Sequence, residues 1–430
     1  MKRRDFLKST AAFASLTFLP SSVWAFTKNG KLRTAHIGVG GQGYSNLSSV
    51  SSHPQVEVTA LCDVDLNNLA AAQKLHPNAK IYTDYRKLYA ELGHAIDAVV
   101  VSTPDHTHAP ASIMAMELGK PVYCEKPLTH HVSEARAMRK LAEENNLITQ
   151  MGIQCHSSDE YRKAVILIQS GLIGKVSSVH AWSDKNWGFD GPAPLGSDPV
   201  PETLDWNLWL GTAPERPYKN QIYHPALWRK IIDYGCGTLG DMGVHIFDTP
   251  YTALELDVPE TIKTSCRKPN GFWHPEKNRV EYTFPGTKYT TEKLGWVWYD
   301  GIEAPEKHED LILPESEKLP EQGALFVGEK GNLLLPHWEL PKLIINGKYE
   351  KIDFPELDIH DHYHQFVDSC LGKDQCSAPF SYAARLTEAI LLGVVANRFP
   401  AKNLHWDNHA AEFKEQEANK LLQATYRAFL

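Results

Sequence analysis

Two residues four positions apart, Asp241 and His245, suggest an acid–base site in the segment GDMGVH. In a helix this spacing puts both side chains on one face, and the flanking Gly240 and Gly243 let another group approach closely. Oxidation of a secondary alcohol needs a base for the hydroxyl proton while hydride leaves the same carbon, and an imidazole held by a carboxylate suits that role near neutral pH. A buried hydrogen-bonded pair is the alternative interpretation.

A glycine-rich turn early in the chain indicates a hydride acceptor for such a base. The segment LRTAHI is typical of a short strand, and G-x-G-x-x-G follows it directly with Gly38, Gly40 and Gly43. These glycines permit a tight turn and let the backbone approach a pyrophosphate at the start of the next helix. Asp63, twenty residues past Gly43 at the end of the next strand, is placed to accept hydrogen bonds from a ribose. The pattern predicts a dinucleotide site with NAD favoured over NADP.

The first half of the chain alternates strand-like and helix-like segments. The strands are expected at 32–37, 56–64, 95–103 and 121–127, and the helices at 44–50, 67–75, 85–92 and 109–118. Such alternation predicts a parallel sheet buried on both faces, with ligands beyond the carboxyl ends of its strands. Segments 103–108 and 125–127 follow two of those ends and should line the cofactor cleft. His106 and His108 have the spacing of metal ligands, but a loop pair without a third donor is more often structural.

From residue 150 onward the pattern changes to longer alternating strands, which predict a mostly antiparallel sheet with one solvated or interfacial face. The clearest are at 176–183, 260–268, 280–286 and 293–301. Two final helices are expected at 382–399 and 412–430, packed against both domains and back on the first. Trp187, Tyr223 and Trp228 offer faces for stacking on sugar rings, although aromatic residues of this kind also serve sheet packing. The histidines at 360–364 begin a helix in which alternate residues do not share a face, so no metal site is predicted.

The motif Glu125-Lys126-Pro127, the glycine turn and the run DYGCGTLGDMGVHIFD (233–248) together resemble the glucose–fructose oxidoreductase and inositol dehydrogenase (Gfo/Idh/MocA) family. The segments WNLWLG and HPALWR are similar to parts of its secreted, sugar-acting members. The resemblance implies an α/β protein with an N-terminal Rossmann domain and a C-terminal α+β domain. The C-terminal domain would hold a large, open, mostly antiparallel sheet that often forms the oligomer interface.

The resemblance also implies residue roles. His245 would be the base, Asp241 its partner or a substrate contact, and Lys126 the cation that polarises the reacting oxygen. The cofactor-binding residues are expected to be Gly38, Gly40, Gln42, Gly43, Asp63, Thr103, Pro104, His106, Glu125, Lys126 and Gln154. The substrate contacts are expected to be Trp187, Tyr223, Trp228 and Arg229.

The first residues, MKRRDFLKST, match a twin-arginine export signal, and cleavage is expected after Ala25. The predicted domains are then 26–150 and 151–430. A folded, periplasmic enzyme would have to carry its NAD tightly bound, because the periplasm is not expected to supply free nucleotide. Seven cysteines are scattered without a C-x-x-C pair and are expected to be free core thiols. The net charge of −8 comes from intermixed acids and bases, which argues against nucleic-acid or membrane-surface partners.

The leading hypothesis is therefore a periplasmic, homo-oligomeric, NAD-dependent carbohydrate oxidoreductase, a dimer or tetramer exported by the twin-arginine machinery. The alternative is a glycosidase that oxidises its sugar transiently with bound NAD, eliminates the aglycone and returns the hydride. A sugar-binding protein with a vestigial cofactor site is disfavoured, because Lys126, Asp241 and His245 are all present.

Overall fold

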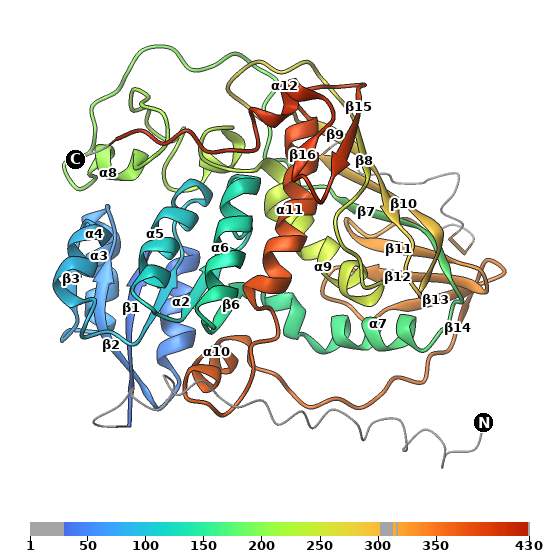
Figure 1. Cartoon of the computed structure of the whole chain (residues 1–430), viewed down its shortest axis with the longest axis horizontal. Helices are drawn as coiled ribbons and strands as arrows, with labels where there is room; N and C mark the ends of the chain where they lie inside the picture. The colour runs from blue at the N-terminus through green and yellow to red at the C-terminus, as the bar shows by residue number, and fades with distance from the viewer. Residues whose placement is uncertain (1–29, 302–312, 315–316, 429–430) are drawn as a thin grey trace.

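The computed structural model describes residues 30–301, 313–314 and 317–428, so the predicted export signal at 1–25 lies outside the described residues. Two sheets organise the described chain, with six and ten strands. Figure 1 shows them side by side, with helices over the smaller sheet and between the two. No helix among the described residues is long and apolar enough to cross a bilayer. The predicted fold class, a Rossmann domain with a second domain on a larger sheet, is confirmed.

The six-stranded sheet is entirely parallel, with the order β3-β2-β1-β4-β5-β6. Its strands are β1 (Leu32–Ile37), β2 (Val56–Cys62), β3 (Lys80–Tyr82), β4 (Ala98–Val101), β5 (Val122–Glu125) and β6 (Thr149–Gly152). The helices between them are α2 (Gln42–Ser51), α3 (Leu66–Leu75), α4 (Tyr85–Leu92), α5 (Asp105–Glu117) and α6 (Val132–Glu144). Every residue of β4 is buried, because helices cover both faces of the sheet, which explains its uninterrupted apolar sequence.

The ten-stranded sheet is mixed, with the order β14-β13-β12-β11-β7-β10-β9-β8-β15-β16. Neighbouring strands are antiparallel except for β7 and β10, which are parallel. Its strands are β7 (Val176–Ser183), β8 (Thr261–Cys266), β9 (Lys277–Pro285), β10 (Thr290–Gly301), β11 (Gln322–Gly328), β12 (Gly331–Pro336), β13 (Lys342–Ile345), β14 (Lys348–Glu350), β15 (Asn403–Asp407) and β16 (Glu412–Phe413). The α-helices that follow β6 in the described chain are α7 (Asp159–Gln169), α8 (Trp206–Leu210), α9 (Val244–Ala253), α10 (His362–Cys370), α11 (Phe380–Ala396) and α12 (Gln416–Asn419).

Helix α11 joins the two halves of the molecule, and Figure 1 shows it standing between the two sheets. It contacts α6 on one side and β8 on the other. Its Glu388 side chain is fully buried and accepts hydrogen bonds from Arg136 of α6 (2.6 Å) and Arg385 (2.8 Å). A buried carboxylate needs such partners, so this ion pair ties α11 to the Rossmann domain. Helix α11 therefore packs against both halves of the described chain.

The second expected final helix, at 412–430, is wrong. Among the described residues 412–428 only α12 is helical, and the first residues form β16. Phe413 is fully buried against Trp406, and Arg427 donates hydrogen bonds to the carbonyl oxygens of Gly211 (2.9 Å) and Asn207 (3.1 Å). These tertiary contacts hold the segment extended, which outweighs its helical sequence preference. The seven cysteines are free, as predicted.

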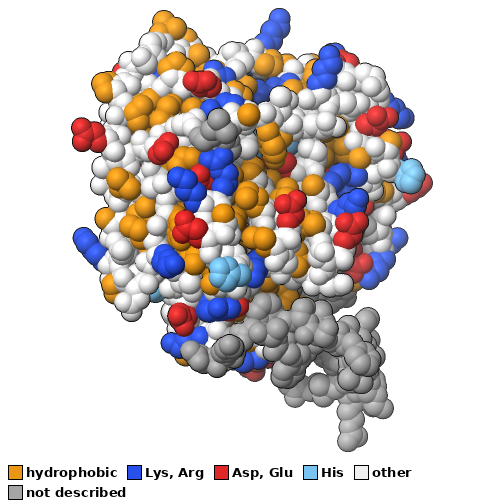
Figure 2. Space-filling view, turned by 60° about the vertical axis from the view of Figure 1, so that its left-hand side comes forward, with side chains coloured by type: hydrophobic (Ala, Val, Ile, Leu, Met, Phe, Trp, Pro, Cys, Tyr) orange, Lys and Arg blue, Asp and Glu red, His pale blue; other side chains and the backbone are white. Residues whose placement is uncertain are grey.

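The surface carries charges of both signs. On the face in Figure 2, Lys and Arg side chains lie among Asp and Glu side chains rather than in one block. This matches the sequence, in which 44 basic and 52 acidic residues are intermixed.

Candidate active site

A cavity of about 770 Å³ is lined by residues from the glycine turn and from the segment of Asp241 and His245. Most of the predicted site residues line it, namely Gly38, Gly40, Gln42, Gly43, Asp63, Thr103, Pro104, Glu125, Lys126, Gln154, Trp187, Trp228, Arg229, Asp241 and His245. Two predicted residues, His106 and Tyr223, do not. Residues more than 200 positions apart in sequence therefore meet at one site.

The glycine turn forms a tight cradle at one end of the cavity. Gly38 has a φ of +79°, and a Cβ atom on it would lie 2.5 Å from the Ser102 carbonyl oxygen. A Cβ atom on Gly43 would lie 2.1 Å from the Gly38 carbonyl oxygen. Among the described residues no side chain caps the start of α2, so no side-chain oxygen accepts a hydrogen bond from its first backbone N–H groups. Backbone this close-packed, at an uncapped helix start, fits the pyrophosphate of a dinucleotide.

Asp63 supports the cradle from the end of β2. Its carboxylate accepts hydrogen bonds from the backbone N–H groups of Val39 (2.9 Å) and Asp65 (2.9 Å), and from the side chain of Asn68 (3.3 Å). Burial raises the pKa of Asp63, and these three donors oppose that rise. The carboxylate thus fixes the glycine turn and also lines the cavity where a ribose would lie.

A second network lies behind the cradle and is centred on Glu125. Its carboxylate accepts hydrogen bonds from Asn46 (2.9 Å) and Gln154 (3.0 Å). Asn46 of α2 in turn accepts from Gln42 (2.9 Å) and from the hydroxyl of Tyr363 in α10 (3.2 Å). Helix α10, from the far end of the chain, therefore braces the helix that begins at the glycine turn.

At the other end of the cavity, Asp241 lies in a π-helical turn (Leu239–Gly243) directly before α9. Such turns are rare and often occur at functional sites. Lys126 Nζ donates to the Asp241 Oδ1 atom (2.7 Å) and to its carbonyl oxygen (2.9 Å), and Arg229 Nε donates to the same Oδ1 (3.2 Å). Burial opposes ionisation of Asp241, but the positive charges of Lys126 and Arg229 outweigh it and lower the pKa of the carboxyl group. Asp241 is therefore an anion shared by two cations.

His245 is the first-turn residue of α9 that lines the cavity. Its Nδ1 atom lies 3.4 Å from Cys155 Sγ, and its ring centroid lies 5.9 Å from that of His337. Burial and the nearby charge of Lys126 lower the pKa of His245 well below its usual range, so the imidazole is neutral at pH 7 and can accept a proton. Within the described residues no hydrogen bond joins it to Asp241, because Asp241 is engaged by Lys126 and Arg229.

His106 and Tyr223 belong to a hydrophobic cluster beside the cavity. Helix α5 begins at Asp105, which turns His106 toward the carbonyl oxygens of Trp209 (3.0 Å) and Tyr234 (3.4 Å). Burial lowers the pKa of His106 to about 4. Tyr223 packs against the aromatic rings of the same two residues, Trp209 and Tyr234. Neither side chain lines the cavity, so the structure places both residues behind its wall.

His108, the other histidine of that loop, lies between two carbonyl oxygens, those of Thr103 and Pro127, at 2.8 Å from each. It connects the two loops that follow β4 and β5. No cluster of three or more potential metal ligands occurs in the described part of the chain.

Several cavity residues were missed by the sequence interpretation, and four of them, with polar or aromatic side chains, come from three separate segments. Asp105 begins α5, Lys185 follows β7, and His337 and Trp338 follow β12. Tyr161 of α7 hydrogen-bonds to His337 Nδ1 and stacks on Trp338. Of these four, only Asp105 lay within a segment, 103–108, that the sequence placed at the cleft.

The family models match both domains. Residues 32–153 match the oxidoreductase family model for the NAD-binding Rossmann fold, and residues 159–282 match the model for its C-terminal alpha/beta domain. Together the two matches span more than half of the chain. The chain belongs to the Gfo/Idh/MocA oxidoreductase family. Its Rossmann domain is an NAD-binding domain by that model.

Individual relatives match over shorter stretches. A glycosyl hydrolase family 109 protein of Stenotrophomonas maltophilia is 35% identical over 136 residues, 29% of this chain and 29% of that protein. Inositol 2-dehydrogenase of Rhodococcus erythropolis is 32% identical over 155 residues, 35% of this chain and 44% of that protein. The alignments thus span less than half the length of both relatives. The crystal structure of aldose-aldose oxidoreductase from Caulobacter crescentus, complexed with glycerol, covers 87% of this chain and 99% of its own, with a TM-score of 0.59 and 14% identity. That likeness concerns the fold.

Replacing Asp105 by Asn is expected to stabilise the protein at alkaline pH. Burial raises the pKa of Asp105 from 3.8 to about 7, so between these values the folded state holds a proton that the unfolded state has lost. Native stability therefore falls as pH rises through this window, by up to about 1.4 kcal/mol per pH unit, and levels off above it. Asn keeps the acceptor for the Cys236 N–H (3.1 Å) without the charge. Urea unfolding of both proteins at pH 5 and pH 8 should show an Asn advantage that is larger at pH 8; an equal difference at both pH values contradicts the prediction.

Proposed function

We propose that this protein is a periplasmic, NAD-dependent oxidoreductase that acts on a secondary alcohol of a sugar or glycoside and keeps its cofactor bound through turnover. The observation that carries the proposal is the neutral His245 beside the Lys126–Asp241 pair, in the same cavity as the glycine cradle. The similarity to an inositol 2-dehydrogenase and to an aldose-aldose oxidoreductase supports a polyhydroxy substrate. We propose a homo-oligomer, as the family resemblance suggests.

Each residue has a chemical task in this proposal. A bound nicotinamide supplies the hydride acceptor. Lys126 directs its ammonium group at the reacting oxygen and stabilises negative charge as the hydroxyl proton leaves. His245 takes that proton, and Asp241 holds Lys126 in place through the 2.7 Å contact. The glycine cradle and Asp63 would hold the dinucleotide.

NAD is expected to exceed NADP in the purified protein. Asp63 would repel a 2′-phosphate and accept a hydrogen bond from a free 2′-hydroxyl. Mass spectrometry of the small molecules released from natively purified protein checks this expectation. Stoichiometric NADP would contradict it.

Added NAD is expected not to raise the steady-state rate of freshly purified enzyme, and the cofactor should survive extensive dialysis. A periplasmic enzyme without free nucleotide has to complete its cycle on the protein: one sugar reduces bound NAD and a second carbonyl compound reoxidises it, with ping-pong kinetics. Initial rates with and without added NAD, before and after dialysis, test this. Dialysis to an inactive apoprotein that added NAD restores would show an ordinary exchangeable dehydrogenase.

A second candidate is a redox-neutral glycosidase, favoured by the 35% identity to a glycosyl hydrolase family 109 protein. In this reaction oxidation to a ketone acidifies the neighbouring carbon, the aglycone is eliminated as a double bond forms, water adds in place of the aglycone, and the hydride returns to the ketone of the same sugar. Release of p-nitrophenol from p-nitrophenyl glycosides without any second carbonyl compound distinguishes it. A dehydrogenase instead requires an acceptor for sustained turnover.

A further inference from the structure

The end of the cavity around Asp241 carries excess positive charge. Lys126, Lys185 and Arg229 line it, whereas the ionised carboxylate among them is Asp241, which two of these cations already contact. The buried Asp105 is the second acid there, and burial raises its pKa to about 7, so it is only partly ionised at neutral pH. Asp63 hydrogen-bonds the glycine turn at the opposite end. Glu125 lies between the two ends: its carboxylate accepts from Asn46 of α2 and from the backbone N–H of Lys126 (3.1 Å), and burial raises its pKa while the charge of Lys126 opposes that rise. Lys185 and Arg229 therefore carry the positive charge that faces no carboxylate other than Asp241 and Asp105 among the described residues of the cavity wall.

The pKa values of the two imidazoles at this end are lowered by the same positive charges. Burial lowers the pKa values of His245 and His337, and both Lys126 and Lys185 lower them further. His337 has a pKa of about 4. Neither ring therefore adds charge at pH 7, and neither neutralises the cations. An anion entering this end of the cavity would be attracted by the excess positive charge.

Arg229 offers unused hydrogen-bond donors to such an anion. Its guanidinium carbon lies 4.2 Å from the ring centroid of Trp228 and 5.6 Å from that of Trp187, and its Nε contacts Asp241. Within the described residues, no acceptor contacts its two terminal nitrogens. Its side chain is 26% exposed and lines the cavity. A stacked, planar guanidinium is pre-organised for two parallel hydrogen bonds to a carboxylate.

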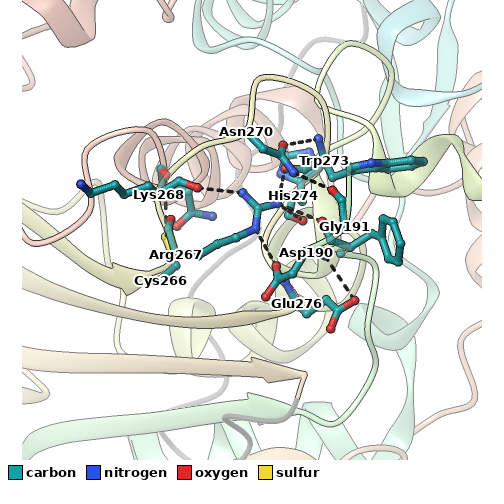
Figure 3. Close-up of polar contacts among 12 residues, drawn as sticks. Asp190, Gly191, Cys266, Arg267, Lys268, Asn270, Trp273, His274 and Glu276 are labelled. Carbon is teal, nitrogen blue, oxygen red and sulfur yellow. Dashed lines mark hydrogen bonds and ion pairs between the residues drawn. The ribbon is translucent and has the colours of Figure 1, made fainter. Parts of the chain in front are cut away.

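The wall that carries Lys185 and Trp187 is firmly built. Figure 3 shows Arg267 at the centre of its support, donating to Asp190 Oδ1 (2.6 Å) and to the carbonyl oxygens of Trp273 (2.9 Å) and His274 (3.1 Å). Arg267 also donates to the Phe189 carbonyl oxygen (3.0 Å), two residues after Trp187. The segment after β7 is thus fastened to the loop after β8, so the side chains it presents to the cavity are held in place.

We propose that the substrate is a sugar acid, whose carboxylate binds Arg229 and Lys185 while its ring lies against Trp187 and Trp228. This inference rests on the proposed oxidoreductase function and adds the charge of its substrate. One guanidinium and one ammonium group match a planar, singly charged carboxylate. A neutral sugar would leave the terminal nitrogens of Arg229 without a charged acceptor.

The test compares acids with neutral sugars of matching configuration on the holoprotein. Calorimetric titration with D-glucuronate, D-galacturonate and D-gluconate, against D-glucose, D-galactose and D-glucitol, should show at least one acid binding about 10- to 100-fold more tightly than its neutral partner. Lys185→Met should reduce this acid preference by about 10-fold. The matched control is Lys175→Met, because Lys175 is exposed just before β7 and does not line the cavity.

The outcomes separate this inference from the proposed function. Equal affinity for every acid and its neutral partner, or no binding of any acid, overturns the inference. If neutral sugars then still reduce the bound cofactor, the oxidoreductase proposal stands alone. If an acid binds preferentially through Lys185 but neither acids nor neutral sugars reduce the cofactor, the inference stands and the oxidoreductase proposal fails. Tighter binding of D-glucose 6-phosphate than of any acid overturns the assignment to a carboxylate.

Discussion

Replacing His245 by Ala is expected to slow reduction of the bound cofactor by about 10²- to 10⁴-fold, because the variant lacks the base that takes the hydroxyl proton. Lys126→Met is expected to show a loss of similar size. It removes the ammonium group that contacts Asp241 at 2.7 Å and that would stabilise negative charge on the reacting oxygen. Both variants should keep their NAD, because the cradle formed by Gly38, Gly43 and Asp63 is untouched. Single-turnover absorbance of the reduced nicotinamide, under a sugar that reduces the parent protein, measures the effect.

The matched control is His409→Ala, an exposed histidine outside the cavity. It should reduce its cofactor at the parental rate. An unchanged rate in His245→Ala would remove His245 from the mechanism. The pH profile gives a second check: because burial and Lys126 hold the pKa of His245 well below 6.5, the rate should not fall as pH decreases from 8 to 6 through loss of this base.

Replacing Gly43 by Ala is expected to weaken cofactor binding and lower the NAD content of the purified protein. The added Cβ would lie 2.1 Å from the Gly38 carbonyl oxygen and 3.1 Å from Ser102 Cβ, so α2 and the glycine turn have to move apart. Overpacking of this kind costs about 1–3 kcal/mol, which corresponds to a roughly 5- to 150-fold loss of cofactor affinity if it falls on the bound state. NAD content per protein chain after purification and urea unfolding of the apoprotein check the two parts of the effect.

Gly295→Ala provides the control for this substitution. Gly295 lies in β10 at the exposed surface, and its Cβ would meet only Ser178 Cβ, at 3.9 Å. This variant should keep its NAD and its stability. Parental NAD content in Gly43→Ala would show that the turn relaxes without loss of the dinucleotide.

Local patterns were enough to predict one end of the cavity. Gly38, Gly43 and Asp63 lie within a single strand–helix–strand unit, so their spacing alone predicts that they meet. Lys126 follows a strand of the same sheet, and parallel strands end at the same edge. Asp241 and His245 are neighbours in the chain. The cavity brings these three short segments together.

The other end depends on the order of the strands in the larger sheet. Lys185 follows β7 and His337 follows β12, and these strands are brought near each other because β11 lies between them. Nothing in the local sequence around His337 marks a functional residue. His106 was misplaced for a different reason: the exact start of α5 decides which way each side chain of that loop turns, and helix boundaries are the least certain part of a sequence interpretation.

The brace that α10 provides to the glycine turn is made late in synthesis. The hydroxyl of Tyr363 reaches Asn46 across 317 positions of the chain. At a synthesis rate of roughly 5 to 20 residues per second, the ribosome needs roughly 15 to 60 seconds to make the intervening segment. The glycine turn is therefore synthesised well before α10, and the contact with Tyr363 can form only when nearly the whole polypeptide has been made. The network around Glu125 and Asn46 is therefore complete only after α10, close to the end of the chain, has been made.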